Sequence, residues 1–165
     1  MPTHHRGSES EVRALNAYIN LVRASDSVVS RLSAQIEATG LTLPQFGILE
    51  AVYHLGPLCQ KTLAEKLLRS SGNITVVVAN LEKHGWVRGV REAEDRRMIQ
   101  IHLTPRGRKL IARVFPKHAK EIAKQFGVLS VVEQETLRGL CRKLGTAGKC
   151  GDESAQRRHQ KGETK

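Results

Sequence analysis

Aromatic residues are scarce in this chain, and long apolar runs are missing. Phenylalanine, tryptophan and tyrosine together make up 4% of the residues, so the apolar set is aliphatic, which favours helices packed along aliphatic seams over an all-β sandwich. No stretch approaches the ~18 consecutive apolar residues of a transmembrane helix, and the first residues form no charged-then-apolar leader. We therefore expect a mostly helical protein located in the cytoplasm.

Cysteine pairing is absent as well. Cys59, Cys141 and Cys150 form no C-x-x-C pair and are odd in number, which argues against a disulfide framework. We expect reduced thiols, with Cys141 in an apolar seam of the core. Cys59 stays open as a redox-sensing thiol, because it lies near the expected start of a short helix and beside Lys61, where the helix dipole and a cation lower a thiol pKa.

Catalytic and metal-binding patterns are also missing from the sequence. It contains no G-x-S-x-G, no glycine-rich phosphate loop and no H-E-x-x-H, and its seven histidines are too dispersed for their spacing to predict a zinc site. We therefore expect neither an enzyme nor a cofactor or metal.

Positive charge is abundant and unevenly distributed. The net charge is +11 over 165 residues. Residues 1–60 carry a net charge of −1, whereas residues 61–109 and 110–165 each carry +6. A basic central segment is typical of a phosphate-binding surface, although a solvated charged face would also account for it. A sequence-neutral nucleic-acid-packaging protein is one alternative that this charge leaves open.

Apolar periodicity predicts a mostly α (α+β) fold with about six helices and one hairpin. The folded region spans residues 10–144, between a flexible segment over 1–9 and a polar, disordered tail over 145–165. Helices are expected over about 10–39, from 43, over 60–68 and 73–84, from 105 and from 131. Pro116 predicts a kink or interruption in the fifth helix. The first helix is too long for a small domain to cover, so we expect it to pack against a second subunit.

The third and fourth helices, separated by the short turn 69–72, form a helix-turn-helix candidate. Ile74, Val77, Val78 and Leu81 recur at helical spacing and predict the buried stripe of the fourth helix. The outer face then holds short side chains that can hydrogen-bond base edges or touch a thymine methyl group, and this composition suits insertion into a major groove. These outer residues are Asn73, Thr75, Val76, Ala79, Asn80 and Lys83.

Two expected strands, 86–91 and 97–103, follow with a charged turn between them. Alternation places Ile99, Ile101 and Leu103 on one face, which we expect to be buried. The basic tip can reach phosphates or a narrow minor groove. It carries Arg91, Arg96 and Arg97, with Asp95 as the residue that holds an arginine in position through a paired hydrogen bond.

The run from Asp95 to Gly107 reads D-x-R-x5-L-T-x-x-G and resembles the multiple antibiotic resistance regulator (MarR) family of winged helix-turn-helix transcription factors. The resemblance implies a DNA-binding lobe over about 43–104, with Asp95 bracing the wing and Arg97 contacting DNA. It also implies a homodimer formed by the first, fifth and sixth helices. Several relatives carry basic side chains where this chain has Val76, Asn80 and Gly89.

The expected function is that of a transcriptional repressor, which binds a palindromic operator on double-stranded DNA and is released by a small aromatic or phenolic ligand. The DNA-binding candidates are Thr62, Ser70, Ser71, Asn73, Thr75, Val76, Asn80, Lys83, Arg91, Arg96 and Arg97. The effector-binding candidates are Tyr18, Phe46, Tyr53, His54, Trp86 and Phe115, for which ordinary core packing is the alternative explanation. A regulator that senses oxidants through Cys59 is the second functional alternative.

Overall fold

The computed structural model describes residues 3–67, 70–91 and 99–147. The chain divides into two compact units, Met1–Ile122 and Ala123–Lys165, and each is described by itself. Within the described ranges, no helix is long and apolar enough to cross a bilayer.

The first unit begins with the long helix α1 (Glu9–Glu37), which confirms the helix expected over 10–39. Ser8 caps it in a capping box: its hydroxyl accepts from the Glu11 amide, and the Glu11 carboxylate accepts from the Ser8 amide at 2.7 Å. Burial is confined to its last turns, at Leu32 and Ile36. Earlier apolar side chains such as Tyr18, which is 64% exposed, lie uncovered in the single chain.

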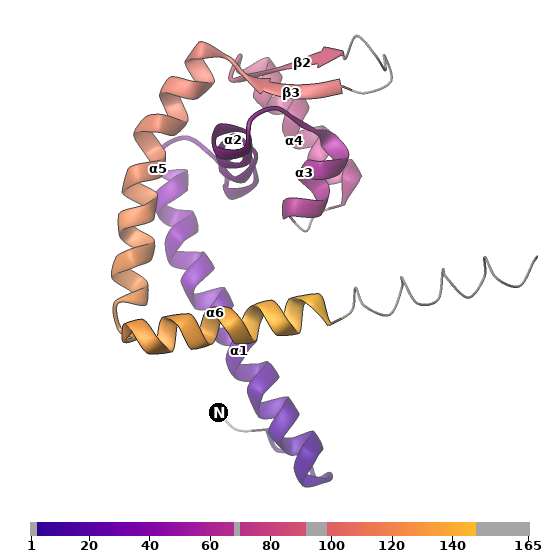
Figure 1. The fold of residues 1–165 in the computed structure, drawn as a ribbon, viewed down its shortest axis with the longest axis vertical. Coiled ribbons are helices and arrows are strands. Elements are labelled where there is room, and N and C mark those ends of the chain that lie inside the picture. The colour runs from indigo at the N-terminus through magenta and orange to yellow at the C-terminus, as the bar shows by residue number, and fades with distance from the viewer. Residues whose placement is uncertain (1–2, 68–69, 92–98, 148–165) are drawn as a thin grey trace, which may run out of the picture. The chain divides into compact units, whose positions relative to one another are not determined.

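Three helices form the centre of a compact lobe (Figure 1): α2 (Leu43–Leu55), α3 (Gln60–Leu67) and α4 (Ser71–Lys83). Thr42 caps α2 in a second capping box with Gln45, and Pro44 lies in the first turn, where its missing amide hydrogen costs nothing. Apolar side chains from all three helices meet those of the sheet and the fifth helix in one core. Its most deeply buried members include Phe46, Leu49, Leu63, Ile74, Leu81, Ile101 and Ile111.

The sheet has three antiparallel strands in the order β1-β3-β2: β1 (Leu58–Cys59), β2 (Val87–Arg91) and β3 (Ile99–Leu103). The two-stranded hairpin predicted from the sequence therefore lacked one strand. Two residues are too few to show an alternating pattern, and β1 exists because Leu58 pairs with Ile101 from a distant part of the chain.

The predicted burial of β3 is only partly correct. Ile101 is buried and Leu103 is half-buried, but Ile99 is 39% exposed. Ile99 lies opposite Arg91 at the far end of β2, beyond the helices that cover the middle of the strand. Alternation identified the correct face of β3 but not where its cover ends.

Thr104 connects the sheet to helix α5 (Pro105–Phe126). Its hydroxyl donates to the Gly85 carbonyl at 2.7 Å and accepts from the Gly107 amide at 3.0 Å, while its own amide donates to the Trp86 carbonyl at 3.0 Å. The helix continues through Pro116, so the interruption considered from the sequence does not occur. Proline leaves the Ala112 carbonyl without its helical partner, and Ala112 is exposed, so water can satisfy this group.

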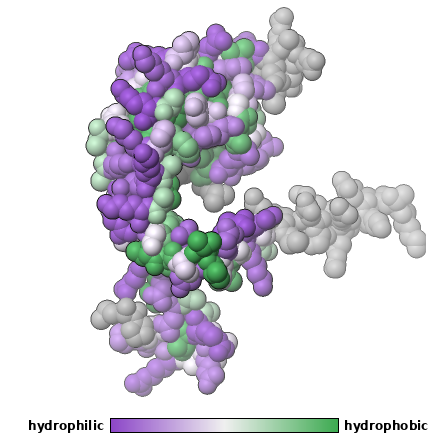
Figure 2. Space-filling model, turned by 60° about the vertical axis from the view of Figure 1, so that its left-hand side comes forward, coloured by the Kyte–Doolittle hydropathy of each residue, from purple (hydrophilic) through white to green (hydrophobic). Residues whose placement is uncertain are grey.

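The second unit contains α6 (Val131–Thr146), which begins at the expected residue and is capped by a capping box between Ser130 and Glu133. No residue of α6 is buried. Cys141 is exposed, and Leu140 and Leu144 are 61% and 64% exposed, so the prediction that Cys141 lies in the core is wrong for the single chain. Figure 2 shows hydrophobic residues gathered on the surface over α6 and the turn before it. The predicted apolar residues are present on α6, but they are exposed in the described part of this unit.

Gly107 provides a test of the connection between sheet and helix. A Cβ there would overlap the Trp86 carbonyl oxygen, so Gly107→Ala should reduce the free energy of unfolding by roughly 1–3 kcal/mol, measured by urea denaturation. Gly72→Ala is the control, because a Cβ at Gly72 meets nothing within 4 Å. The control should be neutral or stabilising by up to ~1 kcal/mol. Equal effects of the two substitutions would contradict the proposed close contact.

Candidate DNA-binding interface

Helix α4 has one buried face and one exposed face, as its periodicity predicts. Ile74, Val78 and Leu81 are at most 2% exposed. The opposite face carries Asn73, Thr75, Val76, Ala79, Asn80 and Lys83, all of them exposed. Val76 is 63% exposed although it is apolar. A face made of amide, hydroxyl and methyl groups with a single cation can read base edges and thymine methyl groups.

The amino-terminal end of α4 is fixed by side-chain hydrogen bonds. Ser70 is the N-cap, and its hydroxyl accepts from the Asn73 amide at 3.4 Å. The Thr75 hydroxyl lies 2.9 Å from the Gln60 side-chain oxygen on α3 and 3.1 Å from the Ser71 carbonyl oxygen. Its only hydrogen is therefore directed at protein acceptors. Thr75 holds α3 and α4 together and leaves its methyl group for outside contacts.

The carboxyl-terminal end of α4 is attached to the sheet through Glu82. The Gly89 amide on β2 donates to a Glu82 carboxylate oxygen at 2.8 Å. A Cβ at Gly89 would lie 2.9 Å from Ile99 Cγ2 and 3.2 Å from that carboxylate oxygen, so a larger residue would disturb the contact. No local pattern in the sequence predicts this bond, because it joins a helix to a strand across a turn. Several relatives have a basic residue at position 89. The glycine in this chain instead leaves room for the hydrogen bond that connects α4 to the wing.

The wing is described up to its strand ends. Arg91 is the last residue of β2 and is exposed, opposite Ile99 on β3. The other wing candidates, Asp95, Arg96 and Arg97, lie outside the described residues. Arg88, which the sequence-based selection omitted, is exposed on the same strand as Arg91.

Thr62 and Cys59 lie together where β1 meets α3. The Cys59 Sγ atom is 3.2 Å from the Thr62 hydroxyl oxygen. Hydrogen bonds from the Thr62 side chain and backbone lower the pKa of the Cys59 thiol, and they outweigh the effect of its partial burial. The expected direction of the shift is correct, but its main cause is Thr62 rather than the charge of Lys61.

The six effector candidates do not form one cluster. Three of them gather between α2 and α5: the Tyr53 and His54 rings are 5.0 Å apart, and the His54 and Phe115 rings are 4.4 Å apart. Arg108, which the sequence did not single out, lies over the Tyr53 ring at 5.6 Å. The remaining three are separate: Phe46 is buried against His118, Trp86 stacks on His84, and Tyr18 is exposed on α1.

Two helices separated by three residues and combined with a small antiparallel sheet define a winged-helix DNA-binding fold. A model of the MarR family matches residues 41–99. The chain is 34% identical over 139 residues to the uncharacterized HTH-type transcriptional regulator YkoM of Bacillus subtilis strain 168, covering 84% of this chain and 90% of that protein. The chain therefore belongs to the MarR family and is a DNA-binding transcriptional regulator, as the run from Asp95 to Gly107 implied.

Solved structures show the same fold. A MepR-like protein complexed with pseudoligands is 33% identical, with a TM-score of 0.59, and the match covers 84% of this chain and 94% of that chain. Sco3205, a MarR family regulator from Streptomyces coelicolor in complex with DNA, is 22% identical with a TM-score of 0.76, covering 87% and 91% of the two chains. This second likeness concerns the fold alone.

The contact between Cys59 and Thr62 can be tested by alkylation. Thr62→Val removes the side-chain hydrogen bond that lowers the thiol pKa, so less thiolate exists near neutral pH and the reaction profile moves to higher pH. Alkylation of Cys59 by iodoacetamide, followed by mass spectrometry, should slow by a factor of roughly 2–5. Cys141 in the same sample is the internal control, and its rate should not change. An unchanged Cys59 rate would show that Thr62 does not stabilise the thiolate.

Proposed function

We propose that this regulator reads its operator with the exposed face of α4 in the major groove. The observation that carries the proposal is the composition of that face: Asn73, Val76 and Asn80 are exposed, and Lys83 adds the only positive charge. Asn side chains pair with adenine through two hydrogen bonds, and a valine methyl group suits the thymine methyl group. A face kept merely for solubility would carry pairs of opposite charges instead.

The remaining DNA-binding candidates suit contacts with the phosphate backbone. Ser70 and Ser71 lie at the amino-terminal end of α4, where free amides attract anions. Thr62 is on α3, and Arg91 is at the end of β2. Arg96 and Arg97 contact the minor groove or its phosphates in this proposal, with Asp95 bracing them. Together with α2, these elements form the DNA-binding lobe over about 43–104, within a regulatory domain over 10–144 that acts in the cytoplasm.

The same proposal makes the protein a homodimer. In the single chain, α1 leaves Leu21, Val22 and Val29 exposed, and α6 leaves Leu140 and Leu144 exposed. Exposed apolar stripes on two helices are typical of an interface between subunits. Two α4 helices related by a two-fold axis would read a palindrome with half-sites about 34 Å apart.

A small aromatic anion is the effector class that we propose. Tyr53, His54 and Phe115 supply aromatic surface, and Arg108 supplies a positive charge beside them. The cluster lies between α2 of the DNA-binding lobe and α5, so a ligand there would change the spacing of the α4 helices in the two subunits. The MepR-like relative was solved with pseudoligands. Release from the operator on binding makes the protein a repressor in this scheme, and the lowered Cys59 pKa favours oxidant sensing as a second mode of release.

Selection of bound sites from random duplex DNA tests the function. We expect a symmetric site with affinity at least about 10³-fold above random duplex. Asn80→Ala should weaken binding to that site by roughly 1–3 kcal/mol and relax its base preference, because the amide hydrogen bonds to a base are lost. Fluorescence anisotropy measures both affinities.

The control is Asn20→Ala, the same chemical change at an exposed position of α1, which lies outside the DNA-binding lobe. It should leave operator affinity unchanged. Equal affinity of the wild-type protein for the selected and random duplexes would identify a sequence-neutral packaging protein, and full operator affinity in Asn80→Ala would remove α4 from base recognition.

Sedimentation equilibrium tests the dimer. Leu140→Lys places a charge in the exposed seam of α6, so it should raise the dimer dissociation constant by at least about 100-fold, since burying an unpaired ammonium group costs several kcal/mol. Arg142→Glu, on the opposite face of α6, should have little effect. A wild-type protein that sediments as a monomer at micromolar concentration would refute the homodimer.

A further inference from the structure

One face of α5 carries a row of cations. Arg106, Lys109, Arg113, Lys117 and Lys120 are separated by three or four residues, so they share one side of the helix. All five are exposed. At 1.5 Å per residue, the row is roughly 21 Å long. Figure 2 shows hydrophilic residues over much of the α5 side.

None of these five cations forms an ion pair with another described residue. From Pro105 to Lys120, α5 contains no acidic residue, and its first one, Glu121, follows the row. Like charges at this spacing destabilise a helix, and solvated helix faces usually alternate the two signs. An uncompensated row of this kind favours an external anion.

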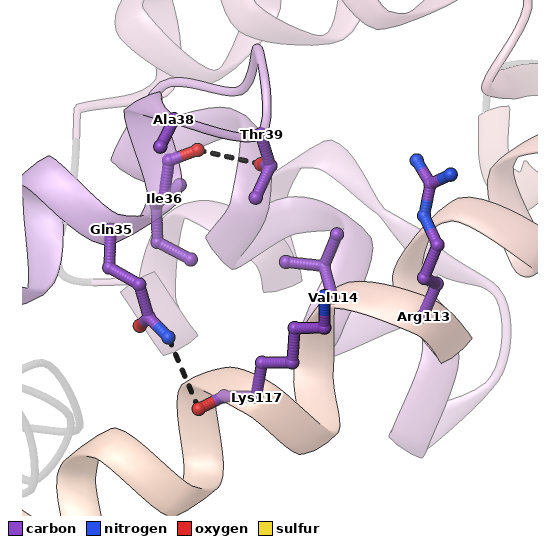
Figure 3. Close-up of a pocket in the computed structure, with 7 residues that line it drawn as sticks. All are labelled: Gln35, Ile36, Ala38, Thr39, Arg113, Val114 and Lys117. Carbon is purple, nitrogen blue, oxygen red and sulfur yellow. Dashed lines mark hydrogen bonds between the residues drawn. The ribbon is translucent and has the colours of Figure 1, made fainter.

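Four of the cations line two adjoining hollows between the end of α1 and α5. The first has a volume of about 410 Å³, and Thr39, Trp86 and Leu110 line it together with Arg106, Lys109 and Arg113. The second has a volume of about 460 Å³, and Gln35, Ile36, Thr39 and Val114 line it with Arg113 and Lys117. Figure 3 shows Gln35, Ile36 and Thr39 on the α1 side of the second hollow, and Arg113, Val114 and Lys117 on the α5 side. Because both hollows share Thr39 and Arg113, we treat them as one feature, the α5 groove.

The groove combines an apolar, aromatic end with a charged length. Trp86 is half-buried and stacks on His84 with ring centroids 4.5 Å apart, so it is held in place at one end. Arg106, Lys109, Arg113 and Lys117 extend from there along the helix. An aromatic ring that stacks or packs at the Trp86 end would bring attached phosphates toward the cations, where guanidinium groups bind phosphate through paired hydrogen bonds.

We propose that the α5 groove binds a nucleotide bearing two or more phosphates, with its base at the Trp86 and Leu110 end and its phosphates along Arg106, Lys109, Arg113 and Lys117. This site shares no residue with the exposed face of α4. It is also distinct from the aromatic cluster, because Arg108 and Phe115 lie on another side of α5. A second copy of the chain is a poor occupant, since its exposed helix stripes are apolar and would bury four cations without partners.

Trp86 is the only tryptophan in the chain, so its fluorescence reports directly on the groove. Titration of the full-length protein with ATP or GTP, without DNA and with excitation at the red edge of the tryptophan band, should give saturable quenching at micromolar concentration. Isothermal titration calorimetry should give the same affinity. Inorganic tripolyphosphate should compete more weakly than ATP, and adenosine should not bind measurably.

The variants separate the groove from general charge attraction. Lys109→Gln combined with Arg113→Gln should weaken ATP binding by at least about tenfold, because two phosphate partners are lost. Lys120→Gln removes the same charge from the same row but lines neither hollow, so it should leave the affinity within about twofold. Both variants should keep wild-type circular dichroism and affinity for the selected DNA site. Arg113→Lys, which keeps the charge, should bind more tightly than Arg113→Gln.

Three results would overturn the proposal. The first is the absence of saturable ATP or GTP binding up to about 1 mM. The second is an equal loss of affinity in Lys120→Gln, which would indicate diffuse attraction along α5. The third is loss of nucleotide binding in Lys83→Gln, which would place the nucleotide on the α4 face. Because these titrations contain no DNA, failure of the nucleotide site and failure of operator recognition give separate results.

Discussion

The contact of Thr104 with the Gly85–Trp86 segment determines how the rest of the lobe is arranged. Thr104 lies between the end of β3 and the start of α5, and its hydroxyl oxygen accepts a hydrogen bond from the Gly107 amide. Its own hydroxyl and amide donate to the carbonyl oxygens of Gly85 and Trp86, which follow α4. Gly85 has a φ of 68° there, which reverses the chain after α4 without the strain that a side chain would add. The end of the recognition helix, the start of the wing and the start of α5 are therefore fixed at a single point.

This arrangement holds α4 from both ends. The bond between Thr75 and Gln60 fixes its first turns to α3, and the bond between Glu82 and the Gly89 amide fixes its last turn to β2. A helix held in this way loses little conformational freedom on binding DNA, because its position relative to the wing is already set. Rigid presentation matters for a face whose side chains are short, since short side chains cannot compensate for a displaced backbone.

Local patterns in the sequence predict the helices and the site, whereas contacts between distant segments escape them. The stripe of Ile74, Val78 and Leu81 repeats within one helix, and the caps at Ser8, Thr42 and Ser130 each lie three residues from their partners, so these features are visible in the sequence. The strand β1, the exposure of Ile99 and the Glu82–Gly89 bond depend on residues from other elements. Cys141 illustrates a further limit, because an apolar seam in the sequence does not indicate which chain covers it.

The sparse charge of α4 has a thermodynamic consequence for the search for a target. If α4 enters the major groove as proposed, Lys83 is its only exposed cation, so the helix displaces few condensed counterions and gains little from duplex DNA of arbitrary sequence. In the proposed complex its contribution arises almost entirely when the bases match its amides and methyl groups. In this proposal, the basic residues outside α4 provide the sequence-independent affinity for DNA, and α4 provides the sequence specificity.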